Sequence, residues 1–261
     1  MMTDSFAGKR VVVTGAAGIF GGWIADAFVK AGATLCLSDM RGDLLPGVVE
    51  RIGADPSTTL LHGTDLTQSS SIADLASFVA SNWNAPDIVI NNAGVYPRTG
   101  LLIDLAEAEF DRIMSVNVRA PFLVTQAMAR LMVAEGVQGS FINIGSGAAR
   151  QMPTGSVPYC MSKTALERLS KGQALELAPH KIRVNVVEPG FAPGSDFSAL
   201  PPDYVARMTA RIPLGRNSEP DDTPSAVLYL CSPAAVFITG ATLAVDGGNS
   251  IGTFQPPATN Q

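Results

Sequence analysis

A tyrosine and a lysine one helical turn apart are the residues of this chain best suited to acid–base chemistry. Tyr159 and Lys163 begin a segment with apolar residues at helical spacing and neither proline nor glycine until Gly172. A helix places both side chains on one face. An ammonium group within about 4–6 Å lowers the pKa of a phenol, and such a pair can exchange a proton with an alcohol near neutral pH. The alternative is a tyrosine packed at a helix start beside a solvated lysine.

A glycine cluster near the N-terminus is suited to phosphate binding. A β-branched run from Arg10 to Thr14 predicts a buried parallel strand, and a helical pattern runs from Ile19 to Ala31. Between and within them lie Gly15, Gly18, Gly21 and Gly22. Glycines let the backbone approach a pyrophosphate, whose charge is stabilised at the helix N-terminus. This order predicts a dinucleotide-binding unit, and a tight turn without a ligand is the alternative.

A carboxylate ends the second predicted strand. Asp39 follows the strand from Thr34 to Ser38. A carboxylate at this place can accept hydrogen bonds from the adenosine ribose and repels a 2′-phosphate, which favours NAD over NADP. The alternatives are that Asp39 caps a turn, and that the nearby Arg41 binds a phosphate.

The rest of the chain alternates strands with helices. Further strands are expected at about 60–66, 87–90, 140–144, 183–187 and 242–245, and helices at about 43–52, 71–83, 105–135 and 222–231. Six or seven strands without a repeat or linker predict a single α/β domain over residues 1–261, a doubly wound parallel sheet (Rossmann fold) with helices on both faces. The Pro-, Gly- and Ser-rich segment at about 191–215 is expected to be a substrate lid.

Composition excludes several classes of partner. The net charge is −5 with no run of lysine or arginine, so neither nucleic acid nor an anionic membrane is expected to bind. We expect no secretion signal and no membrane span, and therefore a cytoplasmic protein. The three cysteines are far apart and the two histidines are too few for a histidine-based metal site, so no metal is expected.

Taken together, the motifs resemble those of the short-chain dehydrogenase/reductase family from Gly8 to about Ser250. They are Thr14-Gly15 with the following glycines, Asp65-Leu66, Asn91-Asn92-Ala93-Gly94, Asn117, Ser146, Tyr159 with Lys163, Pro189-Gly190, Ile212-Pro213-Leu214-Gly215-Arg216 and Asp246-Gly247-Gly248. The spacing Gly15-x-x-Gly18-x-x-Gly21 differs from the Gly-x-x-x-Gly-x-Gly that is commoner at this chain length.

The resemblance implies a role for each motif. Tyr159 would be the general acid/base, Lys163 would lower its pKa and bond the nicotinamide ribose, and Ser146 would bond the substrate oxygen. Asn117 would keep a water that links Lys163 to solvent, while Asp65 and Leu66 would flank the adenine. The implied cofactor-binding residues are Gly15, Gly18, Ile19, Phe20, Asp39, Asp65, Leu66, Asn91, Ala93, Gly94, Tyr159, Lys163, Pro189 and Gly190.

The activity implied is that of an NAD(H)-dependent oxidoreductase that interconverts a secondary alcohol and a ketone. An epimerase, isomerase or dehydratase that retains NAD is the alternative, and a dinucleotide sensor without chemistry is disfavoured by the intact Ser146, Tyr159 and Lys163. The family also implies a homotetramer. The substrate pocket would draw on residues 95–98 and 148–157 and on the lid, with Arg98 and Arg150 either solvated or bound to an anionic group. Ser195 or backbone groups would anchor the nicotinamide carboxamide, and Phe197 would add to a mixed, moderately apolar pocket. The tail beyond Ser250 would dock on a neighbouring subunit.

Overall fold

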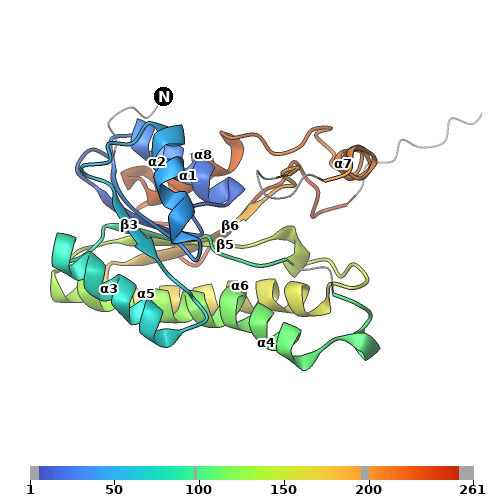
Figure 1. Ribbon diagram of the computed structural model, residues 1–261, viewed down its shortest axis with the longest axis horizontal. Coiled ribbons are helices and arrows are strands. Elements are labelled where there is room, and N and C mark those ends of the chain that lie inside the picture. Colours follow the sequence, from blue (N-terminus) through green and yellow to red (C-terminus); the bar gives the residue numbers. More distant parts are fainter. Residues whose placement is uncertain (1–5, 97–98, 195–199, 253–261) are drawn as a thin grey trace, which may run out of the picture.

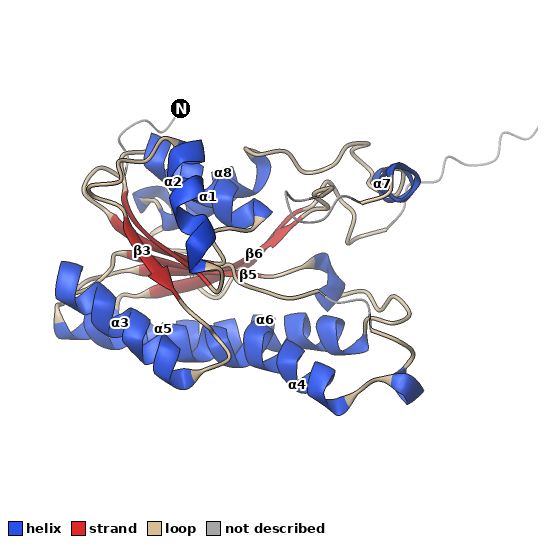
Figure 2. Cartoon of the chain, viewed as in Figure 1, coloured by secondary structure: helices blue, strands red, loops and turns tan. Residues whose placement is uncertain are grey.

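The computed structural model describes residues 6–96, 99–194 and 200–252, and within them the strands form one parallel sheet (Figures 1 and 2). The strand order is β3-β2-β1-β4-β5-β6-β7. The strands are β1 (Arg10–Thr14), β2 (Thr34–Asp39), β3 (Leu60–Gly63), β4 (Ile88–Asn91), β5 (Ser140–Ile144), β6 (Arg183–Pro189) and β7 (Thr242–Val245). The predicted doubly wound fold is confirmed, with seven strands.

Helices cover both faces of the sheet. One face carries α1 (Ile19–Lys30), α2 (Leu45–Ile52) and α8 (Asp222–Cys231), and the other carries α3 (Ser69–Trp83), α4 (Glu107–Met114), α5 (Ala120–Ala134) and α6 (Val157–Leu177) (Figure 1). The two layers enclose separate hydrophobic clusters because alternate residues of a strand point to opposite faces. In β1, Val11 and Val13 pack with Ile24 and Phe28 of α1, whereas Val12 packs in the cluster that contains Met128 of α5.

Several segments differ from the predicted boundaries. β3 ends at Gly63 because the chain turns there, and α3 begins at Ser69 rather than Ser71. The Ser71 hydroxyl accepts a hydrogen bond from the Asp65 backbone N–H, which ties this turn to the helix. A short helix, α7 (Pro202–Thr209), lies within the segment expected to be an irregular lid.

The long helix predicted over 105–135 is divided. A π-helical turn, η3 (Ser115–Arg119), separates α4 from α5, and Pro121 lies in the first turn of α5. Proline is tolerated at that place because the first N–H groups of a helix have no partner within the helix. The interruption therefore arises from the π-helical turn that contains Asn117.

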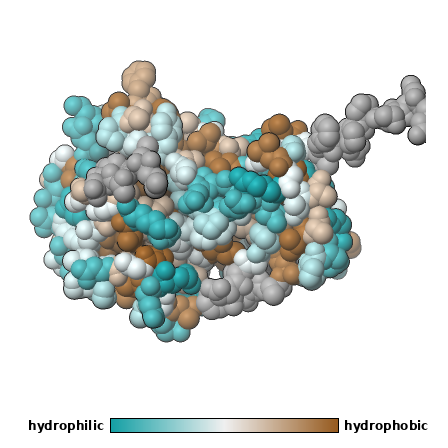
Figure 3. Space-filling view, turned by 90° about the horizontal axis from the view of Figure 1, so that it is seen from above, coloured by the Kyte–Doolittle hydropathy of each residue, from teal (hydrophilic) through white to brown (hydrophobic). Residues whose placement is uncertain are grey.

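The carboxyl ends of the strands meet at one edge of the sheet, beyond which α7 and the loops after β5 and β6 extend (Figure 1). Strand order reverses between β1 and β4, so their following loops separate and leave a crevice of the kind that binds ligands in such sheets. Seen from above, the surface is a mosaic of hydrophilic and hydrophobic residues (Figure 3). Within the described ranges, no helix is long and apolar enough to cross a membrane.

Candidate active site

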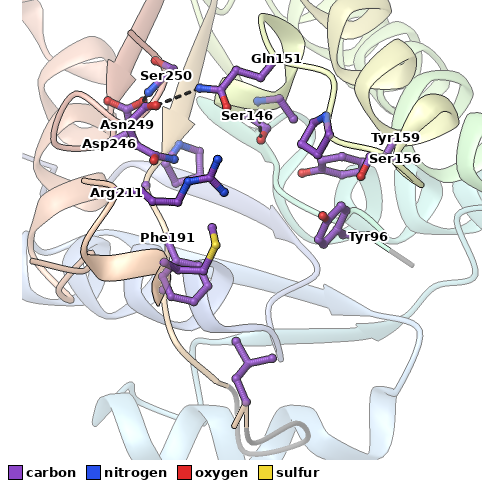
Figure 4. Close-up of a pocket in the computed structure, with 18 of the residues that line it drawn as sticks. Tyr96, Ser146, Gln151, Ser156, Tyr159, Phe191, Arg211, Asp246, Asn249 and Ser250 are labelled. Carbon is purple, nitrogen blue, oxygen red and sulfur yellow. Dashed lines mark hydrogen bonds between the residues drawn. The ribbon is translucent and has the colours of Figure 1, made fainter. Parts of the chain in front are cut away.

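A cavity of about 1240 Å³ opens beyond the ends of β5 and β6. Ser146 and Tyr159 lie on one of its walls, and Phe191, Arg211 and Asp246 on the opposite one (Figure 4). Ile19, Phe20, Pro189 and Gly190, all predicted to bind the cofactor, also line it. One cavity therefore adjoins both the predicted acid–base residues and part of the predicted cofactor site.

Ser146 is positioned by the turn that follows β5. It caps the short helix η4 (Gly147–Ala149), and its Oγ accepts a hydrogen bond from the Ala148 N–H at 3.2 Å. Tyr159 lies in the first turn of α6, and its ring centroid is 4.4 Å from that of Tyr96. Burial raises the pKa of Tyr159, and a hydrogen bond with Ser146 opposes this rise. Ser146 thus contacts Tyr159 and favours ionisation of its phenol.

Lys163 is buried one turn after Tyr159. Its Nζ donates to the Ile144 carbonyl at 2.8 Å and lies 5.8 Å from the centroid of the Tyr159 ring. Burial lowers the pKa of Lys163 to about 8, while the charge of Glu188 acts in the opposite direction. The pairing on one helix face is confirmed, but the predicted lowering of the Tyr159 pKa is wrong for this arrangement, because desolvation of the phenol dominates.

Asn117 joins the π-helical turn to the loop after β4. Its Oδ1 accepts from the Val95 N–H at 2.9 Å, and its Nδ2 donates to the Val95 carbonyl and to Ser162 Oγ, each at 3.0 Å. A Cβ at Gly94 would lie 3.4 Å from Asn117 Oδ1 and 3.5 Å from Lys163 Nζ. The absence of a side chain at residue 94 thus leaves a narrow space that both polar groups border.

The glycine turn after β1 is held against β4. Gly15 has a φ of 63°, and a Cβ there would lie only 2.7 Å from Ala93 Cα. Asn92 Nδ2 donates to the carbonyl oxygens of Thr14 and Gly15, each at 2.9 Å. Among the described residues, no side chain caps the start of α1 at Gly18. The uncapped helix N-terminus behind a close-packed glycine turn fits a pyrophosphate.

Two carboxylates predicted to face the adenosine half are partly engaged within the protein. Asp39 Oδ2 accepts from the Ala17 N–H and Oδ1 from the Arg41 N–H, each at 3.0 Å. Asp65 Oδ1 accepts from the N–H and the hydroxyl of Thr67, and Leu66 is buried in the core. Asp39 therefore lies directly beside the glycine turn, where a ribose could reach its remaining lone pairs.

The side chain of Asn91, predicted to bind the cofactor, forms hydrogen bonds within the protein. It is buried at the end of β4, and its Nδ2 donates to Asn143 Oδ1 at 2.8 Å and to Thr125 Oγ1 at 3.0 Å. Its amide therefore links the sheet to α5. The neighbouring Asn92, which was not among the predicted cofactor-binding residues, holds the glycine turn instead. Side-chain direction alternates along a strand, and only the register determines which asparagine faces which side.

The turn after β7 also lines the cavity, which the sequence did not predict. Asp246 accepts hydrogen bonds from the N–H groups of Gly248 and Ser250, and Gln151 Nε2 donates to the Asn249 carbonyl at 2.8 Å. A glycine-rich turn after a strand carries no sequence signal that it faces a substrate pocket.

Arg150 remains partly exposed to solvent, and it also binds anionic groups of the protein itself. Its guanidinium donates to Glu188 and lies 3.6 Å from Glu167 Oε1. Arg98, Ser195, Phe197 and the tail from residue 253 lie outside the described residues. Among the residues that the structure describes, no cluster of three or more His, Cys, Asp or Glu residues could hold a metal ion.

Comparison with known proteins identifies the family. Residues 15–250 match the family model described as enoyl-(acyl carrier protein) reductase. D-erythrulose reductase of Gallus gallus is 37% identical over 248 residues, which are 94% of this chain and 96% of that protein. L-xylulose reductase of Mus musculus is 36% identical over 95% of this chain and 98% of that protein.

Solved structures agree with these relatives. A short-chain type dehydrogenase/reductase from Mycobacterium marinum superposes with a TM-score of 0.87 at 34% identity, covering 95% of this chain and 97% of the other. A 3-ketoacyl-(acyl-carrier-protein) reductase from Brucella melitensis, complexed with NADH, has a TM-score of 0.83 at 31% identity and covers 94% and 99%. Pseudomonas aeruginosa RhlG with NADP has a TM-score of 0.88 at 27% identity and covers 96% and 100%. The chain belongs to the short-chain dehydrogenase/reductase family.

Proposed function

We propose that this oxidoreductase interconverts a small polyhydroxylated ketone and its secondary alcohol, with NAD(H) as the cofactor and Tyr159 as the acid–base group. The observation that carries the proposal is the shared cavity, which Ser146 and Tyr159 border together with Ile19, Pro189 and Gly190. A substrate in it would meet a proton donor and the predicted nicotinamide site at once.

Tyr159, Ser146 and Lys163 would have separate roles in acid–base catalysis. Tyr159 would give its proton to the ketone oxygen during reduction and take it back during oxidation. Ser146, which already bonds the phenol, would donate to the same oxygen and stabilise its developing charge. Lys163, whose pKa is about 8, would return the proton to Tyr159 from a water held near Gly94 and Asn117. When bound, the nicotinamide supplies or accepts the hydride.

The residues around the glycine turn fit a dinucleotide. The uncapped N-terminus of α1 would hold the pyrophosphate, and Asp39 the adenosine ribose. Carboxylate charge beside a 2′-phosphate would be repulsive, which supports NAD over NADP, although Arg41 lies 3.8 Å from Asp39. Solved relatives bind NADH in one case and NADP in another.

A sugar-like substrate suits the polar groups of the cavity. Hydroxyl and amide side chains line the same cavity as Tyr159, namely Tyr96, Gln151, Ser156, Asn249 and Ser250. These groups can bond several hydroxyls of one small molecule. The relatives include a reductase of erythrulose and one of xylulose. We also propose that segment 191–215 closes over this cavity as a lid within a single domain, because Phe191, α7 and Arg211 border it.

We further propose a cytoplasmic homotetramer. Two exposed apolar surfaces would form its interfaces, one on α5 and α6 with Phe122 and Val133, and one around α8 and β7 with Tyr229, Val236, Phe237 and Leu243. Cys36, Cys160 and Cys231 are free thiols, which suits a reducing compartment.

The test is oxidation of NADH, and separately of NADPH, with erythrulose, xylulose, acetoacetyl thioester and an aliphatic ketone, with Tyr159→Phe measured beside the parent protein. We expect turnover of a ketose with NADH that the variant loses. Turnover of the thioester alone would reject the sugar-like substrate, and turnover that persists in Tyr159→Phe would reject the acid–base role.

A further inference from the structure

The guanidinium of Arg150 binds several elements that surround the turn carrying Ser146. Arg150 ends η4, and its Nη2 donates to Glu188 on β6 and, at 3.0 Å, to Ser250 Oγ in the turn after β7. Its Nη1 lies 3.6 Å from Glu167 Oε1 on α6. One side chain thus connects the serine turn with three other elements.

Glu188 is the buried member of this group. Its side chain is 0% exposed, and it is followed directly by Pro189 and Gly190, which line the cavity. A Cβ at Gly145 would come within 3.0 Å of Glu188 Cγ, so the glutamate packs against the residue that precedes Ser146. Glu188 contacts Gly145 at one end of the turn that carries Ser146, and it binds Arg150 at the other end.

The backbone of the turn forms short-range hydrogen bonds. The Ser146 carbonyl accepts from the Ala149 N–H at 2.9 Å, and the Gly147 carbonyl from the Arg150 N–H at 3.1 Å. Its C-terminal side is also tied to α6 by Thr164, whose hydroxyl donates to the Ala149 carbonyl at 2.9 Å, and to the turn after β7 by Gln151. Those bonds join neutral groups, whereas a hydrogen bond between a guanidinium and a carboxylate is charge-assisted and therefore stronger.

We propose that Arg150 and Glu188 form a positioning pair that fixes the Ser146 hydroxyl beside Tyr159. Neither is a catalytic residue, because both act through the serine turn. This inference rests on the proposed acid–base role of Ser146 and Tyr159, and it adds residues outside the motifs of the site.

Other charges face the pair. Lys163 and Glu167 of α6 act on Glu188, and Asp246 acts on Arg150. Oε1 of Glu167 and of Glu188 are buried, and neither has a hydrogen-bond donor among the described residues. Burial and the contact with Glu167 raise the pKa of Glu188 to about 7, whereas the hydrogen bond from Arg150 acts in the opposite direction because it favours the ionised carboxylate. The guanidinium therefore binds the ionised carboxylate most strongly.

Hydrogen exchange of the free protein tests the pair without a substrate. In Arg150→Met we expect amide exchange in residues 147–151 to rise at least about tenfold, while peptides from β1 and α3 stay unchanged. Arg112→Met is the matched control, since it removes an exposed pair with Glu109 and is expected to leave the turn unaffected. Equal protection of the turn in Arg150→Met and the parent protein would overturn the proposal.

A further variant separates positioning from general destabilisation. Arg150→Lys is expected to recover part of the lost protection, and no recovery would count against the ion pair.

With a ketose that the enzyme reduces, Arg150→Met should lower kcat about tenfold or more at an unchanged dissociation constant for NADH. Unchanged kcat would refute positioning. Inactivity of the parent protein on every ketone would instead refute the proposed function and leave the exchange result standing.

Discussion

At the scale of single residues, burial decides the protonation of the active site. Desolvation raises the pKa of Tyr159 and lowers that of Lys163, so both shifts favour the neutral forms. A neutral phenol is the form that can donate a proton to a ketone. Tyr159 is therefore protonated at neutral pH, as the proposed reduction requires.

Replacing Tyr159 with Phe removes the proposed proton donor and little else. We expect kcat to fall about 10²-fold or more, because general acid–base catalysis contributes that much, while the dissociation constant for NADH stays nearly the same. Steady-state rates and NADH fluorescence titration measure the two quantities. A variant as active as its parent would exclude Tyr159 as the acid–base group.

Asp39 is the residue on which the cofactor preference depends. Asp39→Ser removes the carboxylate beside the ribose and retains a hydrogen-bonding group. We expect the ratio of kcat/KM for NADH to that for NADPH to fall about tenfold or more, since repulsion of the 2′-phosphate disappears. Asp65→Ser, which changes a carboxylate held by Thr67, is the matched control. An unchanged ratio in Asp39→Ser would show that Arg41 or another group sets the preference.

At the scale of elements, close contacts between backbones position the cofactor site. A Cβ at Gly21 of α1 would lie 2.2 Å from the Gly15 carbonyl oxygen, and that oxygen belongs to backbone that cannot move aside easily. Asn92 holds the same carbonyl from β4. The glycine turn is therefore fixed both by what packs against it and by a hydrogen bond.

Two glycine substitutions distinguish the close packing at Gly21 from the effect that replacing glycine with alanine has in any helix. Gly21→Ala should destabilise the protein by about 1–3 kcal/mol, because the added methyl group overpacks the turn, and should weaken NADH binding. Gly172→Ala, where nothing lies within 4 Å, should stabilise α6 by about 0.5–1 kcal/mol. Denaturant unfolding measures both. A Gly21→Ala protein with parental stability and NADH affinity would contradict the close approach.

At the scale of the whole molecule, exposed apolar side chains mark the proposed interfaces. Phe237 is fully exposed and Val236 lies beside it, in the connection between α8 and β7. Phe237→Asp should convert tetramers into smaller species, which light scattering after gel filtration measures. Ile103→Asp is the control, since Ile103 is also highly exposed but belongs to neither proposed interface. An unchanged mass of the Phe237→Asp oligomer would show that this surface is not a subunit interface.

Buried charges also shape the pH dependence of folding. The folded-state pKa of Glu188 is raised to about 7 from an ordinary value of 4.5, so the folded chain holds a proton that the unfolded chain has lost. Stability from this group is therefore lost as pH rises from about 4.5 to 7. Glu188→Gln should flatten the dependence of Tm on pH over that interval. An equally steep dependence of Tm on pH in Glu188→Gln would show that other groups cause it.

The sequence alone determined the strand–helix order, because buried parallel strands and their following helices have distinct periods. It also determined the glycine turn and the Tyr159–Lys163 pair, because both depend on spacing within one element. The long helix was predicted without its break, since the π-helical turn at Asn117 depends on contacts with Val95 and Ser162, far away in the chain.

Only the tertiary structure decided what depends on the environment of a side chain. It turned Asn91 into the core and Asn92 toward the glycine turn, brought Asp246 and Ser250 to the cavity, and paired Arg150 with Glu188. It also reversed the expected pKa shift of Tyr159, because desolvation requires the whole surrounding protein. Spacing along the chain fixes which groups share an element, whereas burial and pairing arise only when distant elements pack together.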